Sequence, residues 1–123
     1  MTPSRPKNLN LLTIHFPLPA IISILHRITG VFLLLLIPLA LWGLDVSLTE
    51  SGFTALSAWF ASFYIKALWW ILLIPFCFHL IAGVRHLLAD IHVGDTLPAG
   101  KWSAWLVLVI AALVILLIGI WIW

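Results

Sequence analysis

The chain has few charged residues. Of its 123 residues, six are Lys or Arg and four are Asp or Glu, so that 8% are charged while 64% are hydrophobic. A soluble domain usually carries about 25% charged residues. The polar surface is therefore too small for a globule in water, and the length allows a single domain. Because the basic residues are scattered, we also expect no nucleic-acid partner.

Cysteine and targeting signals are also scarce. The one cysteine, Cys77, lies in an apolar run, which excludes a disulfide framework and a thiolate metal site and leaves a small buried hydrophobe. The first twenty residues resemble neither a secretory signal nor a transit peptide, because prolines interrupt their apolar stretch. We expect a protein that is inserted whole into a bacterial inner membrane.

Long apolar runs dominate the rest of the sequence. A membrane-spanning helix needs about 20 mostly apolar residues, and we predict spans near residues 28–48, 64–88 and 102–123. Residues 50–66 between the first two spans suggest a short interfacial segment, and residues 89–101 a turn. The fold class is therefore all-α, with an N-terminal segment (1–20) and a membrane-anchor domain (21–123). Three transmembrane helices are few for a bundle, so we expect helices of other chains to complete it.

The basic residues predict the orientation of the spans. Most of them precede the first span or flank the second loop: Arg5, Lys7, Arg27, Arg85 and Lys101. The first loop instead carries Asp45 and Glu50, with Lys66 nearby. Because cytoplasmic loops are enriched in Lys and Arg, the N-terminus is predicted to be cytoplasmic.

One group of polar residues lies at the inner end of the second span. His79, Gly83, His86 and Asp90 share a helical face, and Arg85 lies among them. A histidine within a span must bind something. His79 could hydrogen-bond a neighbouring helix, or it could ligate haem iron, with Gly83 leaving room for the macrocycle. The spacing alone leaves both interpretations open.

A second group, Ser23, His26 and Arg27, precedes the first span with i, i+3, i+4 spacing. A hydroxyl and a guanidinium on one face can donate hydrogen bonds to a quinone carbonyl, which gains negative charge on reduction. Alternatively, Ser23 caps a helix or bonds another helix, and Arg27 extends to lipid phosphates.

These motifs resemble a known family. RPKNLNLL from Arg5, SILHRITG from Ser23 and HLIAGVRHLLAD from His79 are similar to the cytochrome b membrane-anchor subunit of succinate dehydrogenase. The likeness runs from Arg5 to the C-terminus. The two longer motifs are specific in combination, although neither is specific alone.

The resemblance implies roles that spacing does not show. His79 matches the axial ligand of haem b, the second axial histidine coming from the other small membrane subunit. Ser23 and Arg27 match residues that line the ubiquinone site, and His26 and Arg27 match positions near the haem propionates. The implied partners are that second anchor subunit, an iron–sulfur subunit and a flavoprotein subunit. The chain would then anchor a respiratory complex and would not be catalytic alone.

Three alternatives compete with this interpretation. A fumarate reductase anchor would use similar chemistry in the other direction, and a haem-free anchor would use His79 only for a hydrogen bond. A small transporter would need a carboxylate within the membrane. All four acidic residues lie at span ends or in loops, which argues against transport.

Overall fold

A computed structural model describes residues 13–94 and 96–123 of the chain. These residues form four helices and no strand: α1 (Leu18–Ser47), α2 (Glu50–Phe60), α3 (Phe63–Asp90) and α4 (Leu97–Ile122). The predicted all-α class is confirmed. Arg5 and Lys7, which were used to predict the orientation, lie outside the described residues.

Helices α1, α3 and α4 are long and apolar enough to cross a membrane. They contain 30, 28 and 26 residues, which at 1.5 Å per residue gives lengths of about 39 to 45 Å. The hydrocarbon layer of a bilayer is about 30 Å thick. Each of the three can therefore span the bilayer and still extend beyond it.

Helices α1 and α4 begin before the predicted spans, and each has a proline in its first turn. Helix α1 begins at Leu18, before the predicted boundaries at 21 and 28, with Pro19 in its first turn. Helix α4 begins at Leu97 rather than near 102, with Pro98 in its first turn and the Thr96 side chain accepting a hydrogen bond from Ala99 N. Proline is tolerated there because the first N–H groups of a helix have no intrahelical partner.

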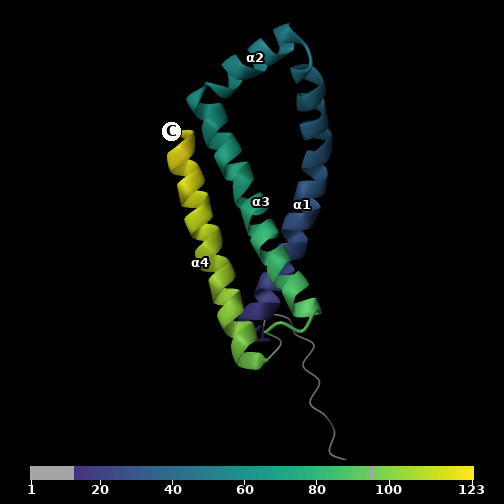
Figure 1. The fold of residues 1–123 in the computed structure, drawn as a ribbon, viewed down its shortest axis with the longest axis vertical. Coiled ribbons are helices and arrows are strands. Elements are labelled where there is room, and N and C mark those ends of the chain that lie inside the picture. The colour runs from purple at the N-terminus through teal and green to yellow at the C-terminus, as the bar shows by residue number, and fades with distance from the viewer. Residues whose placement is uncertain (1–12, 95) are drawn as a thin grey trace, which may run out of the picture.

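The connection between α3 and α4 is consequently shorter than the predicted turn at 89–101. Helix α3 continues to Asp90, and within the connection His92 and Gly94 have positive φ angles of 62° and 75°. Left-handed backbone reverses the chain in few residues, and glycine adopts it without strain. The two helices therefore pack side by side from their connection onward (Figure 1).

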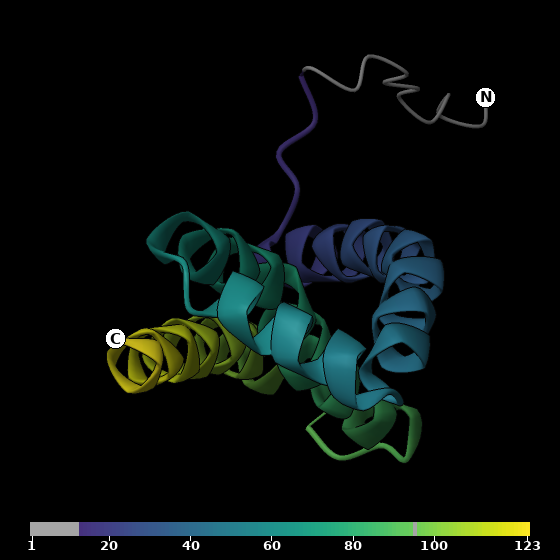
Figure 2. The same cartoon turned by 90° about the horizontal axis from the view of Figure 1, so that it is seen from above.

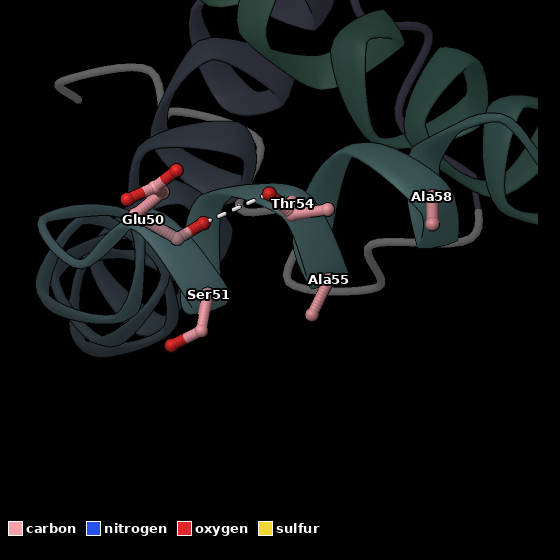
Figure 3. Close-up of a pocket in the computed structure, with 5 residues that line it drawn as sticks. All are labelled: Glu50, Ser51, Thr54, Ala55 and Ala58. Atoms are coloured by element: carbon pink, nitrogen blue, oxygen red, sulfur yellow. Dashed lines mark hydrogen bonds between the residues drawn. The ribbon is translucent and has the colours of Figure 1, made fainter.

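The predicted interfacial segment contains the short helix α2, which links the far ends of α1 and α3 (Figure 2). The Thr49 side chain caps it by accepting a hydrogen bond from Gly52 N at 3.1 Å. Polar and small side chains cover its outer side, where the Thr54 hydroxyl donates to the Glu50 carbonyl (Figure 3). Phe53, Leu56 and Phe60 line an apolar cavity shared with α1 and α3. Helix α2 is thus amphipathic, as an interfacial helix requires.

The small core lies where α1, α3 and α4 converge, near the α3–α4 connection (Figure 1). It consists of Ile22, Ala82, Ala104 and Val107. Toward α2, helices α1 and α3 diverge, whereas α4 stays close to α3 (Figure 1). Two hydrogen bonds hold α4 there, from Lys66 Nζ to Ile122 O at 3.3 Å and from Trp70 Nε1 to Ile115 O at 3.0 Å. Most large apolar side chains remain exposed on the helix surfaces, as expected of helices that span a membrane.

Candidate functional site

The two predicted polar groups meet at the crossing of α1 and α3. The rings of His26 and His79 are stacked, with centroids 4.1 Å apart and planes 9° from parallel. Glycines permit this approach. A Cβ atom on Gly30 would lie 3.0 Å from His79 Cε1, and one on Gly83 would lie 3.2 Å from His26 Nε2. A side chain at either glycine would therefore crowd the histidine ring that faces it.

The Nδ1 atom of His79 is held by helix α1. It lies 3.0 Å from the His26 carbonyl oxygen and 3.1 Å from Thr29 Oγ1. The Thr29 hydroxyl can itself donate to the carbonyls of Leu25 and His26, both at 2.9 Å. Because a carbonyl oxygen only accepts hydrogen bonds, its contact with His79 requires the ring hydrogen to be on Nδ1. The lone pair of the imidazole is then on Nε2.

The Nε2 atom of His79 is available to a ligand. It has no hydrogen-bond partner among the described residues, and it is not one of their fully buried atoms. An apolar cavity of about 470 Å³ between α1 and α3 begins at Gly30, the residue in contact with the His79 ring. A metal-ligating histidine is commonly oriented through its other ring nitrogen by a backbone carbonyl. His79 has this arrangement.

His86 is the third histidine of the cluster. Its ring centroid lies 5.0 Å from that of His26, with the planes at 53°. Its Nε2 is buried and lacks a hydrogen-bond partner within the described residues. His79, Gly83 and His86 therefore all face α1, as their spacing predicts. No group of three or more His, Cys, Asp or Glu residues in the described ranges is arranged to hold a metal ion.

Arg85 does not join this cluster. The Arg85 side chain turns to α4, where Nε donates to Ser103 Oγ at 3.1 Å and Nη2 donates to Gly100 O at 3.3 Å. Asp90, the last residue of α3, lies on the histidine face but is exposed. The inner end of α3 thus has two polar faces, and only one of them contains the histidines.

Ser23 and Arg27 lie on α1 within one turn of His26. Ser23 is half-buried, Arg27 is exposed, and neither makes a side-chain hydrogen bond within the described part of the chain. Their polar atoms can therefore meet an acceptor supplied from outside this chain. The other two histidines lie apart from the cluster: His15 precedes α1 and His92 is in the α3–α4 connection, both exposed.

Thr29 and Gly30 are the site residues to which the sequence analysis assigned no role. Both belong to the SILHRITG motif, and Thr29 follows His26 by three residues, which places it on the same helical face. This spacing indicates that Thr29 lies beside His26. It does not show that the Thr29 hydroxyl reaches His79, fifty residues further along the chain in α3.

Comparisons with known proteins agree with the motifs. The sequence model of the family described as succinate dehydrogenase/fumarate reductase transmembrane subunit matches residues 1–118. Among the relatives is the succinate dehydrogenase cytochrome b556 subunit of Coxiella burnetii, 40% identical over 125 residues that cover both chains completely. The subunit of the same name from Rickettsia prowazekii is 32% identical over 89% of this chain and 86% of its own. The subunit of the same name from Paracoccus denitrificans is 34% identical over 74% of this chain and 71% of its own.

Proposed function

The chain belongs to the succinate dehydrogenase/fumarate reductase transmembrane subunit family, and we propose that it ligates haem b through His79 and forms part of a quinone-reduction site. Proteins of this kind are membrane subunits of a complex rather than catalysts on their own. The other subunits that we expect are a flavoprotein that oxidises succinate, an iron–sulfur protein and a second small anchor. The relatives' names favour succinate dehydrogenase over fumarate reductase.

The observation that carries the haem proposal is the state of His79. Its Nδ1–H is bonded to the His26 carbonyl at 3.0 Å, and its Nε2 is left without a partner among the described residues. The residues present therefore fit an axial ligand. A bound haem supplies a one-electron carrier whose potential depends on its axial ligands and their hydrogen bonds.

The chain supports one axial ligand rather than two. The His26 ring is stacked parallel on the His79 ring, with centroids 4.1 Å apart, so the two rings are not arranged to face one another across a bound group. His86 Nε2 is buried inside the chain. We therefore infer that the second ligand is a histidine of the other small anchor subunit.

Ser23 and Arg27 are the proposed quinone-binding residues. A quinone takes up two electrons and two protons to become a quinol, and negative charge develops on its oxygens before the protons arrive. The Arg27 guanidinium can stabilise that charge, and the Ser23 hydroxyl can orient the oxygen by donating a hydrogen bond. His26 and Arg27 also have the donors that propionate groups require. The exposed apolar surfaces of the helices would be covered partly by the partner anchor and partly by the bilayer.

We propose that the chain lies in the bacterial inner membrane with its N-terminus cytoplasmic. Arg27, Arg85 and Lys101 all lie near the α3–α4 connection and the start of α1, and they are cationic groups of the kind that stay on the cytoplasmic side. The soluble subunits would dock at this end, close to Ser23 and Arg27.

Haem content tests the first part of the proposal. The complex purified through this chain should contain haem b, and His79→Ala should abolish or sharply reduce the haem per complex. His15→Ala, at an exposed histidine outside the helices, is the matched control and should leave the haem unchanged. A native complex without haem would instead make this chain a haem-free anchor.

Quinone kinetics test the second part. Losing a charged hydrogen bond costs about 1.5–3 kcal/mol, so Arg27→Gln should lower kcat/KM for the quinone about ten- to 150-fold. Ser23→Ala should lower it less, because the lost bond is neutral. Succinate oxidation by a soluble dye should be unchanged in both variants. An equal loss of activity with the dye would contradict a quinone role for these residues. Assays of succinate oxidation and of fumarate reduction would show which direction the complex favours.

A further inference from the structure

An apolar groove runs between α3 and α4 on the side away from the histidines. Its cavity of about 700 Å³ lies within the range of about 300–1,000 Å³ that is usual for ligand sites. Exposed side chains form much of its wall: Leu80, Val84 and Leu88 from α3, and Trp102 and Leu106 from α4. We call this feature the α3–α4 groove.

The position of the groove on α3 indicates what it faces. The face of α3 with His79, Gly83 and His86 meets α1. Successive residues of a helix are rotated by about 100° around its axis. The groove residues Leu80, Val84 and Leu88 therefore lie roughly 100° or more around the helix axis from His79. A partner helix that brings the second haem ligand must approach on the His79 side, a step that rests on the proposed function. The groove then faces the lipid.

Arg85 gives the groove a charged inner end. It lines the groove and donates to Ser103 Oγ at 3.1 Å and to Gly100 O at 3.3 Å. A guanidinium has five N–H donors, of which these bonds use two. Among the groove-lining residues that the structure describes there is no Asp or Glu. Asp90 lies on the histidine face of α3, away from the groove. The positive charge of Arg85 is therefore not balanced by any acidic side chain that the structure describes in the groove wall.

We propose that the α3–α4 groove binds an anionic phospholipid, with its phosphate at Arg85 and an acyl chain along the apolar wall. Phosphate accepts charge-assisted hydrogen bonds from a guanidinium, and basic pockets between helices on the cytoplasmic side bind anionic headgroups. Lys101 and Trp102 are exposed in the first turns of α4 and suit the headgroup region. The described wall offers this guanidinium and no acidic side chain to pair with an ammonium group, so a net anionic lipid is preferred over a zwitterionic one.

The test uses the complete complex in phosphatidylcholine nanodiscs that contain a small fraction of phosphatidylglycerol. Native mass spectrometry counts the retained lipids of each kind. The native complex should retain phosphatidylglycerol preferentially, and Arg85→Gln should reduce that preference about five-fold, the effect expected of one basic residue near a membrane surface. Arg85→Lys should preserve most of it.

A matched pair of variants tests the groove itself. Val84→Trp fills the groove, whereas Val109→Trp places the same side chain on α4 outside it, and the two valines are 51% and 52% exposed. Only Val84→Trp should reduce the retention of phosphatidylglycerol. The haem content should stay normal in both, so a failure here is distinguishable from a failure of haem ligation. Unchanged retention of phosphatidylglycerol in Val84→Trp would overturn the proposal. Loss of the second anchor subunit from the Val84→Trp complex would also overturn it, because it would show that the groove binds a helix.

Discussion

The hydroxyl of Thr29 provides a quantitative test of how His79 is held. The substitution Thr29→Val keeps the shape of the side chain and removes the contact of 3.1 Å to His79 Nδ1. The His26 carbonyl remains as a second acceptor at 3.0 Å. Haem should therefore still bind, but less tightly than in the native complex.

The size of the effect follows from the single lost bond. A neutral hydrogen bond contributes about 0.5–1.5 kcal/mol, which corresponds to about a two- to thirteenfold change in an equilibrium or rate constant. Transfer of haem from the purified complex to excess apomyoglobin measures its release rate. Thr29→Val should raise that rate by this factor. The haem midpoint potential should also rise, because a weaker Nδ1 hydrogen bond makes the ligand less basic.

Two controls isolate the interaction with His79. Thr29→Ser keeps the hydroxyl and should restore most of the native rate. Thr54→Val removes a hydroxyl that likewise bonds a carbonyl one turn earlier, Glu50 O at 2.9 Å, but lies on the exposed side of α2 (Figure 3). Thr54→Val should leave the rate of haem release unchanged. An unchanged rate of haem release in Thr29→Val, or an equal change in Thr54→Val, would show that the Thr29 hydroxyl does not hold His79.

Two further predictions concern the contact between α3 and α4. A Cβ atom on Gly119 would lie 3.0 Å from the Trp70 ring, so Gly119→Ala should destabilise the complex by about 1–3 kcal/mol. Thermal unfolding in detergent would measure this loss, and an unchanged midpoint would contradict the packing described. Lys66→Met removes the bond from Nζ to the Ile122 carbonyl near the C-terminal end of α4. Hydrogen exchange should then be faster in the last turn of α4 alone, and uniform or unchanged exchange would argue against this capping role.

The three long helices could be predicted because their apolar runs exceed the bilayer thickness. The starts of α1 and α4 could not, because Pro19 and Pro98 look like helix breakers until the capping geometry shows that they occupy first turns. Helix α2 was anticipated only as an interfacial segment. Its helical form depends on the Thr49 cap and on apolar contacts with α1 and α3.

The histidine face of α3 was predictable, since helical periodicity fixes which residues of one helix lie together. What lies opposite that face depends on the crossing of two helices. The stacking of His26 on His79 requires the close approach at Gly30 and Gly83, and periodicity within one helix carries no information about it. Arg85 was grouped with the histidines by proximity in sequence, yet it contacts α4.

The central claim is that His79, among three neighbouring histidines, ligates the haem. Low-temperature electron paramagnetic resonance of the oxidised complex detects a low-spin haem with two histidine ligands. This signal should disappear in His79→Ala and persist in His86→Ala, because His86 Nε2 is buried within the chain. A signal that survives in His79→Ala, or one that is lost in His86→Ala, would contradict ligation of the haem by His79 rather than His86.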